Sequence, residues 1–130
     1  MPIKKNANRQ PPLLAYVDIN LADIVSGVAQ GAIELPAGAT IIGGSVEPIV
    51  SFNAATSASI AVGDAAVANR YLAAGDVKAM SLVPLVPTGF TTTAKGDVTV
   101  TVTLVGATTT GKLRLCVQYF KDGRELSSQG

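Results

Sequence analysis

Residues 97–105 read DVTVTVTLV, with a bulky aliphatic side chain at nearly every second position and threonine at most positions between. This period of two is typical of a half-buried β-strand, because successive side chains point to opposite faces of a sheet. The aliphatic face consists of Val98, Val100, Val102 and Leu104. The opposite face consists of Thr99, Thr101 and Thr103. It can be solvated or can pack flat against another sheet or chain without desolvating a charge, and the sequence leaves both possibilities open.

The same alternation recurs along the chain and predicts about eight short strands. Residues 13–20 alternate in this way, and the last two strands, over residues 97–105 and 112–119, are the clearest. We expect 112–119 to form an antiparallel hairpin with 97–105 across the loop GATTTG. Residues 21–30 have aliphatic side chains at helical spacing, but a glycine and the β-branched residues disfavour a helix there.

Glycine and proline mark the predicted turns and irregularities. A tight turn is expected at Pro36–Gly38, and Gly43-Gly44 indicates a bulge or bend inside a long strand. Pro48 has no N–H to donate, which predicts an edge strand or a locally unpaired position. One face of this strand is expected to carry Val46, Pro48, Val50 and Phe52. Three Gly-Asp pairs are expected to mark the starts of strands: Gly63-Asp64, Gly75-Asp76 and Gly96-Asp97.

The middle of the chain is less regular. Ala58, Ile60 and Val62 alternate as in a strand. We expect a loop over residues 64–76 with a short strand around residues 70–73. A further strand is expected over residues 77–86, interrupted by prolines.

This outline predicts an all-β fold, an antiparallel β-sandwich of jelly-roll type with about eight strands. With three phenylalanines, three tyrosines and no tryptophan, its core must consist of Val, Ile, Leu and Ala. We place the sandwich domain at residues 13–130 and an extended basic arm at residues 1–12. The arm carries Lys4, Lys5 and Arg9 and no acidic residue. It is expected to be either a frayed terminus or a tether that becomes ordered on a neighbour.

The composition narrows the possible partners. Charged residues make up 15% of the chain, below the roughly 25% of an average soluble domain, and weakly charged exteriors are typical of assemblies. A net charge of +1 argues against a nucleic-acid partner. There is no apolar run of about 20 residues, so we expect no membrane span, and no signal-peptide core, so we expect synthesis in the cytoplasm.

The residue inventory also argues against an enzyme. Histidine is absent, which removes the usual general base of serine and cysteine nucleophiles and the commonest zinc and iron ligand sets. Paired carboxylates could hydrolyse glycosides, but few aromatic rings are present to bind a sugar. No phosphate-binding glycine loop occurs. We therefore expect no catalytic residue, no cofactor, no metal and no small-molecule substrate.

Several single residues have two interpretations. Cys116, the only cysteine, is expected to be a small buried hydrophobe. Five aspartates lack calcium-site spacing and are expected to form turns and caps, namely Asp18, Asp23, Asp64, Asp76 and Asp97. Arg70 and Tyr71 can anchor their own loop or contact a partner. Tyr119 is expected to face the core and Phe120 to face outward. The candidate interface residues are Lys4, Lys5, Arg9, Arg70, Tyr71 and Phe120.

Five short motifs resemble a family of small structural proteins of tailed bacteriophages, the head decoration or cement proteins. The motifs are the Pro-Ala-Gly turn at 36–38, the FNAATS segment at 52–57, the Val-Gly-Asp at 62–64, the Arg-Tyr-Leu at 70–72, and Tyr119 with Gly123-Arg124. The resemblance covers most of residues 13–125. It implies a virion protein with a jelly-roll fold on the capsid surface and gives no residue-level site.

We therefore expect a decoration protein that binds the major capsid protein, stabilises the shell and forms a homo-oligomer, a dimer or a trimer. Two alternatives stay open. One is a tail, baseplate or head-fibre component. The other is a carbohydrate-binding jelly roll for host adsorption, whose candidate aromatic side chains are Tyr16, Tyr71, Phe90 and Phe120.

Overall fold

Eight β-strands and one short 3-10 helix make up the folded part of the chain in the computed structural model, which describes residues 3–5 and 7–123. In chain order the elements are β1 (Leu13–Asn20), η1 (Leu21–Asp23), β2 (Gln30–Leu35), β3 (Ala39–Val50), β4 (Ser57–Gly63), β5 (Leu72–Asp76), β6 (Val83–Pro84), β7 (Gly96–Val105) and β8 (Lys112–Lys121). The helical spacing in residues 21–30 thus produces a single turn, as the glycine and β-branched residues led us to expect.

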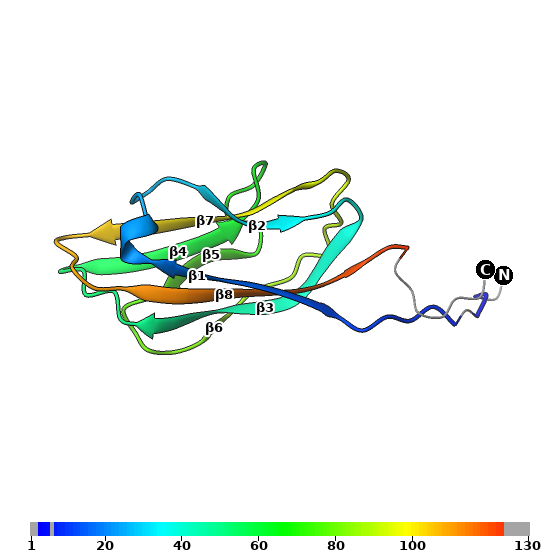
Figure 1. Cartoon of the computed structure of the whole chain (residues 1–130), viewed down its shortest axis with the longest axis horizontal. Helices are drawn as coiled ribbons and strands as arrows, with labels where there is room; N and C mark the ends of the chain where they lie inside the picture. Colours follow the sequence, from blue (N-terminus) through cyan, green and yellow to red (C-terminus); the bar gives the residue numbers. More distant parts are fainter. Residues whose placement is uncertain (1–2, 6, 124–130) are drawn as a thin grey trace.

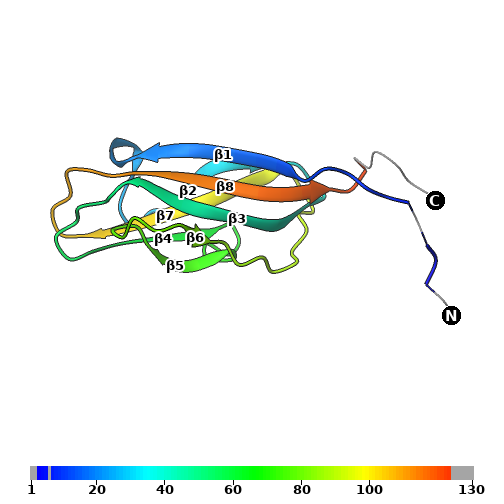
Figure 2. The ribbon, with the colours of Figure 1, turned by 90° about the horizontal axis from the view of Figure 1, so that it is seen from below.

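The strands form two antiparallel sheets that stack face to face (Figures 1 and 2). One sheet has the strand order β1-β8-β3-β6 and the other the order β2-β7-β4-β5. This alternation between two four-stranded sheets is the jelly-roll arrangement. The predicted fold class, an all-β sandwich of about eight strands, is confirmed.

The predicted hairpin between residues 97–105 and 112–119 is wrong. β7 pairs with β2 and β4, whereas β8 pairs with β1 and β3, so the two strands lie in different sheets. The loop between them crosses from one layer to the other. A period of two shows which face of a strand is buried, but it does not show which strand is its neighbour.

The core lies between the sheets and consists mainly of aliphatic side chains, as predicted. The largest side chains with almost no exposure are Phe52, Ile41, Ile60, Leu113, Leu115, Val46, Val62, Val77, Val98, Val102 and Val117. The alternating residues of β7 and β8 therefore face each other across the core, where burial stabilises each by about 1.5–3 kcal/mol.

β3 has the predicted irregularities. It runs unbroken through Gly43-Gly44, where its register with β8 shifts, and Gly44 has φ +139°. β6 pairs only with Ser45 and Val46, so Pro48 lies beyond that ladder, as its missing N–H requires. A second register shift follows Pro48 and turns Val50 outward, where it is 44% exposed. The prediction that Val50 shares one face with Val46, Pro48 and Phe52 is therefore wrong, because those three residues are buried.

The middle of the chain differs from the prediction in three ways. The short strand lies at residues 72–76, two positions later than expected, and residues 77–86 form only the two-residue β6. Two of the Gly-Asp pairs end strands instead of starting them. The physical reason is that the Asp64 and Asp76 carboxylates accept backbone N–H groups two residues further on, at 3.0 and 2.8 Å, which closes a turn.

Candidate interaction surfaces

The predicted interface residues lie on three separate elements. Lys4, Lys5 and Arg9 are exposed on the arm, which leaves the sandwich beyond the start of β1 (Figure 1). The arm is held at its base by Gln10, whose side chain donates to the Lys121 carbonyl at 2.7 Å and accepts from the Lys121 N–H at 3.2 Å. Residues 124–130, which include Arg124 of the Gly123-Arg124 motif, lie outside the described residues.

Arg70 contacts one residue of its own loop and one residue of the segment between β6 and β7. Its Nε donates to the Asp64 carboxylate at 2.5 Å, and its guanidinium lies 3.7 Å from the centroid of the Phe90 ring. Burial would raise the pKa of Asp64, but hydrogen bonds from the Val67 N–H and from Arg70 outweigh it and hold the pKa below its ordinary value. This ion pair fixes the loop over residues 64–70.

Tyr71 is 2% exposed, and burial raises the pKa of its hydroxyl. Its N–H donates to the Val62 carbonyl at 2.8 Å, and its carbonyl accepts from the Val86 N–H at 2.7 Å. The side chain therefore lies in the core and not on the surface. Of the two interpretations of this residue, the structure places it as an anchor.

The largest exposed apolar side chains of a sheet lie on the outer face of β1, β8 and β3. We call this the β1–β8 face and define it by Leu14, Tyr16, Ile42, Ser45, Glu47, Asp18, Arg114, Cys116, Gln118 and Phe120. Leu14 and Tyr16 are each 64% exposed. Tyr16 lies in register with Cys116, which lies in register with Ser45 across the sheet. Phe120 is half-buried at the end of this face, beside the arm.

Two opposite charges on the β1–β8 face, those of Arg114 and Asp18, are already paired with each other. Arg114 donates to both oxygens of Asp18, at 2.7 and 3.2 Å, and lies 5.6 Å from the centroid of the Tyr16 ring. The hydrogen bond from Arg114 holds the pKa of Asp18 below its ordinary value. A partner covering this face would gain apolar contact without having to supply a counter-charge for this pair.

Cys116 lies half-buried in the middle of this face and not in the core, so that prediction needs correction. It alternates in phase with Lys112 and Arg114, which are half-buried on the same face. Burial raises the pKa of its thiol. Tyr16 was already a candidate sugar-binding ring, and the exposed Leu14 could have been found from the sequence, because residues 13–17 read LLAYV and are apolar on both faces.

The threonine face of β7 is only partly open. Thr99 is 8% exposed, whereas Thr103 is exposed. Thr99 lies in register with Gly63, and the 64–70 loop lies so close over Gly63 that an added Cβ would overlap the backbone of Val67 and Ala68. Among the described residues, neither the Thr99 nor the Thr101 hydroxyl has a hydrogen-bond partner. Part of this face is therefore covered by the chain itself.

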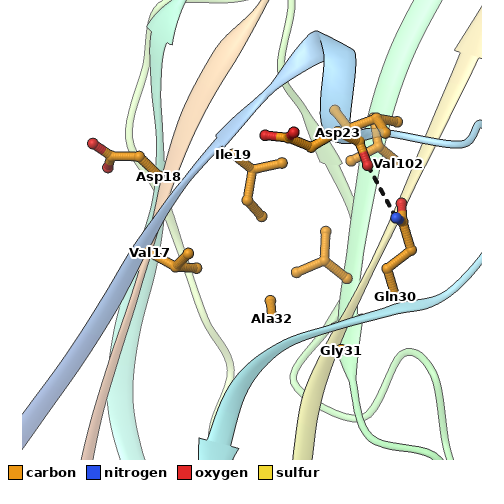
Figure 3. A pocket seen from close by; sticks show the side chains of 10 residues that line it. Val17, Asp18, Ile19, Asp23, Gln30, Gly31, Ala32 and Val102 are labelled. Atoms are coloured by element: carbon orange, nitrogen blue, oxygen red, sulfur yellow. Dashed lines mark hydrogen bonds between the residues drawn. The ribbon is translucent and has the colours of Figure 1, made fainter.

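A slot opens between β1 and β2, at the edge where the two sheets meet (Figure 3). We call it the β1–β2 slot. Its volume is about 180 Å³, and its apolar walls are Val17, Ile19, Ile24, Ala32, Val100 and Val102. Asp23 and Gln30 lie at one end, where Gln30 donates to the Asp23 carbonyl at 3.0 Å, while Asp18 points away from the space.

The described residues hold no group of three or more His, Cys, Asp or Glu side chains placed to bind a metal ion. Three of the five aspartates cap backbone N–H groups as predicted: Asp23, Asp64 and Asp76. Of the four candidate sugar-binding rings, Tyr16 is exposed, Phe90 and Phe120 are half-buried, and Tyr71 is buried. In the same part of the chain, no helix has the length and apolar character needed to cross a membrane.

Comparison with solved structures finds the same fold in phage capsids. A chain of the acid-stable capsid of Helicobacter pylori bacteriophage KHP30 has a TM-score of 0.70 at 21% identity, covering 91% of this chain and 93% of that one. A chain of the cyanophage Pam1 capsid asymmetric unit has a TM-score of 0.67 at 22% identity, covering 93% and 94%. For the capsid of Ralstonia phage GP4 the values are 0.62 at 18% identity, covering 92% and 89%.

No protein-family model matches the sequence, and no curated protein matches it. At these identities the three likenesses establish a shared fold. That fold extends over nearly the whole length of each matched chain.

Proposed function

We propose that this chain is a non-enzymatic virion protein, a capsid decoration or cement protein that binds the major capsid protein on the outer surface of the shell. The observation that carries the proposal is the fold shared, end to end, with chains of three phage capsid structures. The resemblance of the five sequence motifs points the same way. The protein would be made in the cytoplasm of the bacterial host and would need no nucleic acid, membrane, cofactor or small-molecule partner.

The β1–β8 face supports this role as the docking surface. It combines exposed aliphatic and aromatic side chains with an ion pair that is satisfied within the chain. Burying it removes apolar area from water at about 25 cal/mol per Å². A protein that binds only the assembled shell stabilises the shell by linkage. With many copies on one particle, moderate affinity at each site is sufficient.

The basic arm supplies a second attachment. We assign residues 1–12 to this arm and residues 13–130 to the sandwich domain. Lys4, Lys5 and Arg9 reach past the body of the protein, so they can contact a neighbouring subunit while the β1–β8 face rests on the shell. In this arrangement the protein is a dimer or trimer that bridges adjacent capsid subunits.

The test is occupancy on purified heads, measured by cryo-electron microscopy with the wild type and three variants. Leu14→Asp with Tyr16→Ser should reduce occupancy at least tenfold, at roughly 1.4 kcal/mol per factor of ten. Thr103→Asp, an exposed change on the other sheet, should leave it unchanged. Deleting residues 1–9 should weaken attachment while circular dichroism shows an intact fold.

Other outcomes would overturn the proposal. Full occupancy of the Leu14→Asp, Tyr16→Ser variant would remove the β1–β8 face from the interface. Density at the tail in a few copies, instead of on the head in hundreds, would favour the tail or baseplate alternative. Clear binding of host polysaccharide by the isolated protein, lost in Tyr16→Ser, would favour the carbohydrate-binding alternative.

A further inference from the structure

We propose that the β1–β2 slot receives Ile3 from the arm of a second copy of this chain. The slot is an open space with apolar walls at the edge of the sandwich, beside the core that the two sheets enclose. Protein interiors normally leave few voids of this size, and a cavity of about 150 Å³ is enough to hold a benzene molecule. An isoleucine side chain is therefore of suitable size.

The arm carries a side chain that fits. Ile3 is 96% exposed, the highest exposure among the large apolar residues described, and it is the large aliphatic residue of the segment before Pro11. It is followed directly by Lys4 and Lys5. An exposed aliphatic side chain beside two cations is suited to an apolar pocket with an acidic rim.

The rim of the slot has the matching charge. Two acidic residues border the slot. Asp18 points away from the space and is paired with Arg114, which leaves Asp23 as the acidic side chain at the end of the slot. Asp23 is exposed and its carboxylate accepts one hydrogen bond, from the Asn20 N–H at 3.2 Å. Asp23 is therefore the carboxylate that Lys4 or Lys5 of an incoming arm can reach.

The positions of the arm and the slot indicate that the slot receives the arm of a neighbouring copy and not the arm of its own chain. Gln10 ties the base of the arm to the end of β8, and the arm runs away from the sandwich, whereas the slot lies beside the opposite end of β1 (Figure 1). Residues 3–10 span at most about 25 Å when extended. A neighbouring copy must therefore present its slot within that distance of Gln10.

The strands beside the slot also suit an extended segment. Among the described strands, β1 pairs only with β8 and β2 pairs only with β7, so each has one free edge at the slot. A free edge can bind an extended peptide through its backbone N–H and C=O groups. The arm can thus combine a side-chain anchor at Ile3 with pairing along an edge strand.

This inference deepens the self-association part of the proposed function and rests on it, but it does not depend on a capsid. The first experiment is disulfide trapping in the full-length chain with Cys116→Ser. One protein carries Ile3→Cys and the other Ala32→Cys, and the two are mixed and oxidised. A linked dimer of the two is expected. A matched mixture with Ala74→Cys, an exposed residue of β5 in the other edge of that sheet, should give little product.

The second experiment measures self-association by sedimentation equilibrium. Ile3→Asp should weaken self-association and raise the dissociation constant about tenfold to hundredfold. This is the loss expected when one aliphatic side chain is no longer buried. Asp23→Lys should also weaken self-association. Association should be restored when the Asp23→Lys protein is mixed with a second protein that carries Lys4→Glu and Lys5→Glu. Asp76→Lys is the control, because Asp76 also accepts one backbone N–H but lies on β5.

The two experiments separate this inference from the proposed function. Equal trapping by Ala32→Cys and Ala74→Cys, or a mass distribution unchanged by Ile3→Asp, would overturn the arm exchange even if the protein decorates heads. Specific trapping by Ala32→Cys in a protein that fails to bind heads would support the arm exchange and overturn the decoration role.

Discussion

The outer faces of the two sheets are built differently. The β1–β8 face carries exposed Leu14 and Tyr16, whereas the opposite sheet presents small and hydroxyl side chains and is partly covered by the 64–70 loop. The sandwich thus covers one outer face itself and leaves apolar side chains open on the other. The open β1–β8 face is the one suited to a partner. The face of the opposite sheet is covered in part by the 64–70 loop, which packs over Gly63.

The largest expected effect comes from displacing that loop. Gly63→Ala places a Cβ against the backbone of Val67 and Ala68, which no side-chain rotation can relieve. We expect the free energy of unfolding to fall by about 3 kcal/mol. The matched change Gly96→Ala meets no heavy atom within 4 Å and should cost less than about 0.5 kcal/mol. Urea denaturation measures both, and equal values would show that the loop does not rest on Gly63.

A smaller effect is expected at the base of the loop. Asp64→Asn weakens the contacts to Ala66, Val67 and Arg70 and should lower the free energy of unfolding by about 1–2 kcal/mol at neutral pH. Because the folded pKa of Asp64 is lower than its ordinary value of 3.8, this stabilisation is present above about that pH and is lost as the pH falls through the folded pKa.

The pH series for Asp64→Asn should therefore converge on the wild type at low pH. Its counterpart on the β1–β8 face is Asp18→Asn, which breaks a more exposed ion pair. The loss there should be the smaller of the two, because solvent screens an exposed pair. A larger loss of unfolding free energy for Asp18→Asn would mean that the exposed pair on the β1–β8 face contributes more stability than the pair that holds the 64–70 loop.

The sequence predicted the strands and their buried faces because a period of two is local information. It could not predict that β7 and β8 belong to different sheets, because pairing depends on contacts distant in sequence. Val50 turned outward through a bulge that no composition signal marks. Tyr71 was a candidate for the surface, yet its side chain packs in the core. Its backbone N–H and C=O form hydrogen bonds with Val62 and Val86.

The candidate surfaces were predicted less completely than the fold. The exposed basic side chains of the arm follow from a segment too polar to fold alone. Leu14 was present in the outward phase of the first strand but was not chosen as a contact, and Tyr16 was chosen only as a candidate sugar-binding ring. The β1–β2 slot lies between two edges whose separation is set by the packing of the whole sandwich, so no local pattern contains it.

A stabilising change is expected on the covered face. Thr99→Val removes a buried hydroxyl that has no hydrogen-bond partner among the described residues and keeps the shape of the side chain. We expect a gain of about 1 kcal/mol in the free energy of unfolding. Thr103→Val, on the same strand but exposed, should change it by less than about 0.5 kcal/mol. A loss at Thr99 would mean that the hydroxyl is hydrogen-bonded in solution.

The smallest effect on stability is expected at Cys116. The reactivity of its thiol also measures directly whether the β1–β8 face is covered. Cys116→Ser should change the free energy of unfolding by less than about 1 kcal/mol, because the side chain is half-buried and outside the core. Burial raises the pKa of the thiol, so less thiolate is present at neutral pH and iodoacetamide should react more slowly than with the unfolded chain. If the β1–β8 face rests on a capsid, the reaction should slow further on decorated heads. An equal rate for the free and head-bound protein would mean that this face stays open in the particle and that the partner lies elsewhere.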